Sequence, residues 1–149
     1  MIRNETQRRR AIREREELVN AGQSAAESAP LSGSHSAGRA SISGDATTDQ
    51  RLGELDEALA EYEALRSGEA RTLSAEGVEA VGELLIKARI ARGLTISELG
   101  ELLSMSEQQV GRYEQEAWSR ASLWRLAQVA GALELEVDIR AFVAGEVSA

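Results

Sequence analysis

Hydrophobic residues spaced three and four apart recur along most of this 149-residue chain, and this spacing predicts amphipathic α-helices. In the N-terminal half it predicts helices over residues 6–20 and 50–65, and the second has an apolar stripe of Leu52, Leu55, Leu59, Tyr62 and Leu65. The partner of this stripe is either the helix over 6–20, folded back as a helical hairpin, or the same helix of a second subunit. Between them, residues 21–49 are mainly Ser, Ala, Gly and Thr, a composition that predicts a flexible linker.

The C-terminal half predicts four shorter helices around one core. The first covers residues 78–92, and Gly93 is well placed to end it. Two more begin at about residues 96 and 107, and the last begins between Trp118 and Trp124, with Ser119 as its expected N-cap. We expect Trp124 in the core, with a role as a partner anchor as the alternative. The other expected core positions are Val81, Leu84, Leu85, Ala88, Leu99, Leu103, Val110, Tyr113, Leu123, Leu126, Ala127 and Ala130.

Two capping boxes mark the starts of the middle pair of helices. Thr95 stands three residues before Glu98, and Ser106 stands three residues before Gln109, so each pair can satisfy free amide donors at a helix start. The first helix must end before Ser106, which leaves about two turns of helix and a connection of about three to four residues. These are the proportions of a helix-turn-helix unit, in which Gly100 is the small residue that lets the helices approach closely.

The outward face of the second helix carries polar side chains of chemical interest. If Val110 and Tyr113 turn inward, the residues left for solvent or a partner are Glu107, Gln108, Gln109, Gly111 and Arg112. Glutamine can bind adenine and arginine can bind guanine through paired hydrogen bonds, each worth about 1 to 3 kcal/mol of discrimination. The pattern favours a helix that recognises DNA, and the alternative is the solvated face of an ordinary helical bundle.

The run from Leu84 to Thr95, continued through both capped helices to Gly111-Arg112-Tyr113-Glu114, resembles the Xre (Cro/repressor-like) helix-turn-helix family. The resemblance extends through the segment 121–127, which is similar to that family's fourth helix, and covers about residues 78–133. It implies a lambda-repressor-like DNA-binding domain of a bacterial or phage transcription regulator, a fold also used by antitoxins of the HigA kind. It further implies that the residues facing bases or phosphates are Gln108, Gln109 and Arg112.

The end of the chain changes from helical to alternating period. Apolar side chains alternate there with mostly polar ones, which predicts a β-strand whose apolar face consists of Leu135, Val137, Ile139, Ala141 and Val143. No second strand is predicted in the chain, so this strand must pair outside it. We expect pairing with its copy in a two-fold dimer, or addition to the sheet of another protein. A dimer would also present two recognition helices to two DNA half-sites.

Composition narrows the classes of function. The chain has no Cys, which excludes disulfides and thiolate metal sites, and its single histidine, His35, has no ligand or catalytic companion. The sequence contains no phosphate-binding glycine loop, so we expect no enzyme activity, no metal and no cofactor. No apolar run is long enough to cross a membrane and no signal peptide is recognisable, so we expect a cytoplasmic, nucleoid-associated protein.

The charge of the chain is acidic, which constrains any binding to DNA. The net charge is -8, and residues 73–149 contain 7 Lys and Arg against 12 Asp and Glu. The basic side chains that would have to gather on one surface are Lys87, Arg89, Arg92, Arg112 and Arg120. At the N-terminus, Arg8-Arg9-Arg10 offers a phosphate contact, but the intermixed acidic residues favour a solvated helix face.

The sequence therefore predicts an all-α protein with a helical hairpin or coiled-coil region over residues 1–72, a helix-turn-helix domain over 73–133 and a strand and tail over 134–149. The predicted function is sequence-specific transcriptional regulation, as a repressor that binds double-stranded DNA as a homodimer through a recognition helix at about 107–114. Its candidate DNA-binding residues are Thr95, Ser106, Gln108, Gln109 and Arg112. The alternative is an antitoxin or adaptor that holds a basic toxin protein through its helices or its C-terminal strand.

Overall fold

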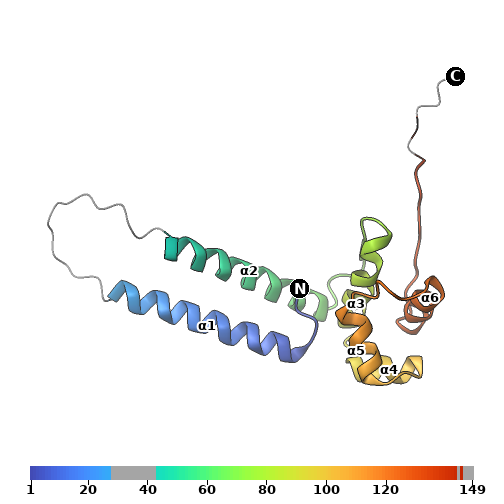
Figure 1. The fold of residues 1–149 in the computed structure, drawn as a ribbon, viewed down its shortest axis with the longest axis horizontal. Helices are drawn as coiled ribbons and strands as arrows, with labels where there is room; N and C mark the ends of the chain where they lie inside the picture. The colour runs from blue at the N-terminus through green and yellow to red at the C-terminus, as the bar shows by residue number, and fades with distance from the viewer. Residues whose placement is uncertain (28–42, 144, 146–149) are drawn as a thin grey trace. The chain divides into compact units, whose positions relative to one another are not determined.

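The computed structural model describes residues 1–27, 43–143 and 145, and all regular structure in this part of the chain is helical (Figure 1). The elements are α1 (Glu5–Glu27), α2 (Ser43–Arg66), the 3₁₀ helix η1 (Val78–Ala80), α3 (Val81–Ala91), α4 (Ile96–Leu103), α5 (Glu107–Gln115) and α6 (Leu123–Ala132). This confirms the all-α class. None of the described helices combines the length and the apolar character needed to span a bilayer. The chain divides into two compact units, residues 1–74 with 90–95, and residues 75–89 with 96 onward.

In the first unit, α1 and α2 lie side by side (Figure 1). Their ion pairs show that they run antiparallel, because Arg8 near the start of α1 contacts Glu63 near the end of α2, and Arg51 contacts Glu14. The apolar seam between them is thin, and its buried members are Ala11, Leu55, Tyr62 and Leu65. The stripe of the predicted helix over 50–65 thus packs on the N-terminal helix of its own chain.

Both helices are longer than predicted. α1 continues to Glu27 instead of ending near residue 20, and α2 begins at Ser43 instead of residue 50. The predicted linker over 21–49 is therefore wrong at both ends, while residues 28–42, which include His35, lie outside the described residues. Adding residues to an existing helix costs little free energy, because the packed part of each helix has already paid for nucleation. Alanine, which is frequent after residue 20, also has the highest helix propensity.

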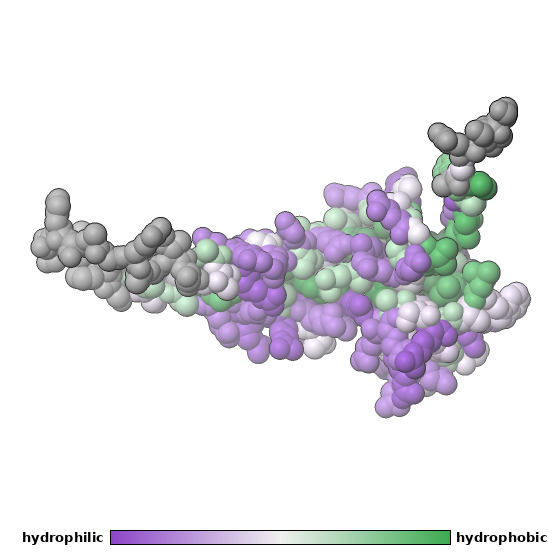
Figure 2. Space-filling view, turned by 45° about the horizontal axis from the view of Figure 1, so that its top comes forward, coloured by the Kyte–Doolittle hydropathy of each residue, from purple (hydrophilic) through white to green (hydrophobic). Residues whose placement is uncertain are grey.

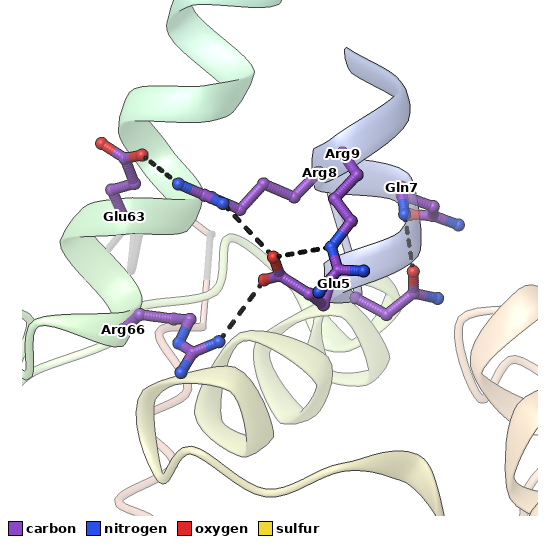
Figure 3. Close-up of polar contacts among 7 residues, drawn as sticks. Glu5, Gln7, Arg8, Arg9, Glu63 and Arg66 are labelled. Carbon is purple, nitrogen blue, oxygen red and sulfur yellow. Dashed lines mark hydrogen bonds and ion pairs between the residues drawn. The ribbon is translucent and has the colours of Figure 1, made fainter. Parts of the chain in front are cut away.

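A cluster of ion pairs joins the start of α1 to the end of α2 (Figure 3). Glu5 Oε1 lies 3.3 Å from Arg8 Nη1, Glu5 Oε2 lies 3.6 Å from Arg66 Nη1, and Arg8 Nη2 lies 3.1 Å from Glu63 Oε1. The hydrogen bond to Glu63, helped by the charge of Glu5, raises the pKa of Arg8 above its usual value. Because these side chains are 30–61% exposed, each pair contributes little to stability.

In the second unit, the helices α3 to α6 surround a packed core. Its most deeply buried large side chains are Ile86, Leu99, Val110, Trp118, Val129 and Leu133. Two glycines permit the closest approaches: a Cβ on Gly82 would lie 1.7 Å from the Ala117 carbonyl oxygen, and one on Gly100 would lie 2.7 Å from the Met105 carbonyl oxygen. The second contact confirms the expected role of Gly100, because Met105 lies in the connection that leads into α5.

The start of α6 differs from the prediction. Its N-cap is Ser122, whose hydroxyl oxygen accepts a hydrogen bond of 3.2 Å from the Arg125 amide, so the expectation of a cap at Ser119 was wrong. The helix begins at Leu123, and the chain from Trp118 to Ser122 forms the connection before it. Trp118, in this connection, is itself a core residue at 2% exposure.

A different face of α6 is consequently turned to the core. Val129 and Leu133 are fully buried, whereas Leu123 and Trp124 are 74% and 73% exposed and Ala127 is also exposed. The prediction that Leu123, Trp124 and Ala127 belong to the core was therefore wrong. Ala127 lies four residues after Leu123 and three after Trp124, so the three side chains form one apolar strip on the outside of α6.

Residues 135–143 follow α6 as an extended trace (Figure 1), and no strand occurs within the described ranges 1–27, 43–143 and 145. A single chain offers this segment no second strand, since everything else that is regular in the described part is helical. The paired C-terminal strand stays a prediction.

Candidate nucleic-acid interface

The helices α4 and α5 are short and joined by only three residues. α4 has 8 residues and α5 has 9, close to the lengths that the capping pattern predicts. In the connection, the Met105 amide donates to the Gly100 carbonyl oxygen at 2.8 Å, and Ser104 has φ 55°. A left-handed conformation costs a non-glycine residue some free energy, so this sharp turn carries modest strain.

A complete capping box holds the start of α5. The Gln109 amide donates to the Ser106 hydroxyl oxygen at 3.2 Å, and the Ser106 amide donates to Gln109 Oε1 at 3.1 Å. This confirms the second predicted capping box. It also places the side-chain oxygen of Gln109 in the cap, so that oxygen is already engaged at the helix start. Thr95 directly precedes α4, and its capping box with Glu98 stays a prediction.

The inner face of α5 is fixed by burial and by one ion pair. Val110 is fully buried, and Glu114, one turn further on, is 3% exposed. Arg89 of α3 donates to Glu114 through Nε at 2.6 Å to Oε1 and through Nη2 at 2.9 Å to Oε2. This two-point contact, with both side chains 3% exposed, constrains the rotation of α5 about its own axis relative to α3.

Arg89 is one of the cations that would have to gather on one surface to bind DNA, but the structure buries its side chain. The sequence does contain a signal for its burial: Glu114 falls four residues after Val110 and one after Tyr113, so a carboxylate lies on the inward side of α5. A buried carboxylate requires a cationic partner. The periodicity of α5 thus marks Glu114 as an inward carboxylate, but which cation pairs with it depends on how α3 packs against α5, where Arg89 follows the buried Ala88.

The end of α5 is held by an aromatic pair. The rings of Tyr113 and Trp118 stack with centroids 5.0 Å apart and planes 7° from parallel. The Trp118 amide donates to the Tyr113 carbonyl oxygen at 2.7 Å, and the backbone turns there through positive φ at Ala117 and Trp118. Within the described part of the chain, the Trp118 indole N–H has no hydrogen-bond partner. The stack confirms that Tyr113 packs inward.

The outer face of α5 is polar and lines an open surface cavity of about 410 Å³. The cavity is bordered by Ile96, Glu107, Gln108, Gly111, Arg112 and Gln115. Gln108, Arg112 and Gln115 are exposed and lie on one helix face because they are four and three residues apart. The structure therefore brings together Gln108 and Arg112 of the predicted site, with Ser106 and Gln109 in the cap beside them.

The charge around this face is mixed. Glu107 lies at the N-terminus of α5, where it suits the helix dipole but opposes a polyanion. Three of the cations expected on one surface are paired with carboxylates: Arg89 with Glu114, Lys87 with Glu83 at 3.3 Å, and Arg120 with Glu116 at 3.6 Å. Arg112 forms no ion pair with the residues that the structure describes. It is therefore the cation of this face that can approach an anionic ligand directly.

Comparisons with models of protein families, with curated proteins and with solved structures find no match. Among the described residues, no group of three or more His, Cys, Asp or Glu is placed to hold a metal ion. The α5 face carries the hydrogen-bonding side chains of Gln108, Arg112 and Gln115. Such a surface can bind and discriminate a ligand.

Proposed function

We propose that this protein is a sequence-specific DNA-binding regulator of the Xre type, acting as a transcriptional repressor, and that α5 is its recognition helix. The observation that carries the proposal is the contrast between the two faces of α5. Val110 and Glu114 fix the inner face, and Gln108 and Arg112 project from the opposite one. A helix that is fixed in rotation presents its outer side chains at defined positions, which base recognition requires.

The polar groups divide into two roles. Gln108 and Arg112 suit base edges, since an amide pairs with adenine and a guanidinium pairs with guanine. Thr95 and Ser106 stand at the starts of α4 and α5, where the positive ends of the helix dipoles suit phosphate oxygens. Gln109, with its oxygen in the cap, retains its side-chain NH₂ group for a phosphate or base. The resemblance of residues 78–133 to the Xre family supports the same assignment.

A homodimer is part of this proposal. The net charge of -8 and the paired cations leave little general attraction to DNA, so one domain alone has modest affinity. Two linked recognition helices, about 34 Å apart on one side of the duplex, double the specific contacts. The dimer therefore compensates for the weak phosphate attraction of each domain.

Selection from random duplex DNA tests the proposal. We expect wild-type protein to enrich a motif with two half-sites. Arg112→Lys keeps the charge but loses the planar paired donors, so it should remove the preference for guanine at one position of each half-site and leave the rest of the motif. Gln108→Ala should relax a different position. Failure to enrich any motif, or an unchanged motif in both variants, would contradict the proposal.

A second candidate function is that of an antitoxin or adaptor that holds a protein partner. The observation in its favour is the exposed strip of Leu123 and Trp124 on α6, because adjacent large apolar side chains in solvent mark binding sites for partners. The acidic charge suits a basic partner such as a toxin. A small basic reading frame beside this gene, whose product co-purifies with the protein, would support this function. It is compatible with repression of the same operon.

A further inference from the structure

We propose that the C-terminal segment 135–143 pairs with the same segment of a second copy of this chain, as an antiparallel two-stranded ribbon centred on Ile139. The partner of this segment is thus a second copy of the protein. The inference rests on the dimer of the proposed function and specifies which element forms it and in which register.

The segment has the surface of an unpaired strand. Its backbone is extended (Figure 1), and it contributes Val137, Ile139, Phe142 and Val143 at exposures of 53%, 77%, 91% and 96%. Figure 2 shows green, hydrophobic surface along the described part of this segment. These are four of the nine large hydrophobic side chains that are exposed in the described part of the chain. Such a segment loses apolar exposure and gains backbone hydrogen bonds when it pairs.

Symmetry limits the registers that are possible. Residues directly opposite one another in an antiparallel pair point to the same face of the ribbon. In a pair of identical strands related by a two-fold axis, opposite residues must therefore have numbers of the same parity. The axis then passes through one residue paired with its own copy, and only the choice of that residue remains open.

The charged side chains of the segment determine which residue lies on the two-fold axis. With the axis at Ile139, Asp138 lies opposite Arg140 of the second copy, and this attractive pair occurs twice. With the axis at residue 138, Asp138 faces its own copy, and with the axis at residue 140, Arg140 faces its own copy. With the axis at residue 137, Glu136 faces Asp138 of the second copy. Like charges directly opposite destabilise a pair, so Ile139 is the centre that places opposite charges together without a like-charged pair.

The apolar face fits the same register. Around Ile139 it places Val137 opposite Ala141 and Leu135 opposite Val143, each pair occurring twice. All of these side chains then lie on one side of the ribbon. In the single chain, Arg140 Nη2 already lies 2.8 Å from Asp138 Oδ2, with the two side chains 76% and 67% exposed. The two charges therefore share a face and remain accessible to the second copy.

Charge reversal on the full chain tests the register, with sedimentation equilibrium as the measurement. Asp138→Arg and Arg140→Asp should each weaken the homodimer by about tenfold or more, because each converts two attractive pairs into repulsive ones. An equimolar mixture of the two variants should form a heterodimer as tight as wild type, since every pair is then attractive. Glu136→Arg is the matched control: that position lies opposite Phe142 of the second copy, so it should change the affinity little.

The outcomes separate this inference from the proposed function. Three results would each overturn the inference: a monomeric wild type, two variants that dimerise as wild type does, or a mixture that forms no heterodimer. DNA binding by a monomer would remove the dimer from the proposed function but leave DNA recognition by α5 in place. Rescue in the mixture, with Glu136→Arg unaffected, supports the register. If such dimers bind no DNA, the function fails and the register stands.

Discussion

The two units of this protein hold their helices together in different ways. α1 and α2 meet along a thin seam and are joined by ion pairs whose side chains are 30–61% exposed. The unit of α3 to α6 has a larger core, and among its described residues one ion pair is buried, Arg89 with Glu114, whose side chains are 3% exposed. Exposed ion pairs contribute little to the free energy of unfolding, whereas removing one partner of a buried ion pair lowers that free energy strongly. The second unit is therefore the one suited to present side chains rigidly, and it carries α5.

The largest expected loss of stability comes from breaking the buried ion pair. Glu114→Ala removes the carboxylate that binds the buried guanidinium of Arg89, which should lower the free energy of unfolding by about 3–5 kcal/mol. The matched change in the first unit is Asp56→Ala, which removes the exposed partner of Arg15 and should cost about 0–1 kcal/mol. Chemical denaturation followed by circular dichroism measures both. Equal losses in the two variants would show that the units do not differ as described.

A double variant sharpens this result. Arg89→Met combined with Glu114→Leu removes both charges and replaces them with apolar side chains of similar size. Because neither charge then stays buried, the double variant should recover most of the stability that Glu114→Ala loses. If the double variant is as unstable as Glu114→Ala, the lost stability comes from packing around Glu114 and not from the ion pair.

Two glycines give the next comparison. Gly100→Ala places a methyl group 2.7 Å from the Met105 carbonyl oxygen, so we expect a loss of about 1–3 kcal/mol as the turn shifts. Gly53 lies inside α2 with no atom within 4 Å of its Cβ position. Gly53→Ala should therefore stabilise the protein by up to about 1 kcal/mol through helix propensity. Thermal unfolding distinguishes the signs, and a stabilised Gly100→Ala would contradict the close contact.

The smallest expected effect comes from salt. Raising the ionic strength from about 0.05 M to about 1 M shortens the screening length to about 3 Å, which weakens exposed ion pairs. Amide exchange should then speed up severalfold in α1 and α2 and change little in α3 and α5. Hydrogen bonds to Glu63 and Glu14 raise the pKa of Arg8 and of Arg51, so both arginines keep their charge up to strongly alkaline pH. Salt therefore weakens these ion pairs under conditions in which a moderate rise in pH does not.

Much of the fold followed from local sequence signals. The Ser106 capping box, the lengths of α4 and α5, and the close approach at Gly100 are set by a few neighbouring residues, and the structure has each of them as predicted. Gly93, at φ 70°, likewise ends α3 as expected. Short-range chemistry of this kind needs no knowledge of the rest of the chain.

Predictions that depended on distant packing did less well. Periodicity alone could not decide which face of α6 is buried, because Leu123, Trp124, Val129 and Leu133 are all apolar and the choice depends on how α6 packs against the other helices. Of the candidate site, the exposed positions Gln108 and Arg112 were predictable from the inward turn of Val110. The buried partner of Glu114 was not found, because two charges far apart in sequence give no periodic signal.

The central claim is that α5 recognises DNA through its outer face, and fluorescence anisotropy with labelled duplex DNA from directly upstream of the protein's own reading frame tests it most directly. Wild type should prefer this duplex to a scrambled one and bind less tightly at higher salt. Arg112→Ala should fold normally and lose the preference, while Arg9→Ala, the same charge change at a side chain 76% exposed in α1, should keep it. Retained preference in Arg112→Ala, or no discrimination by wild type at low salt, would contradict the account.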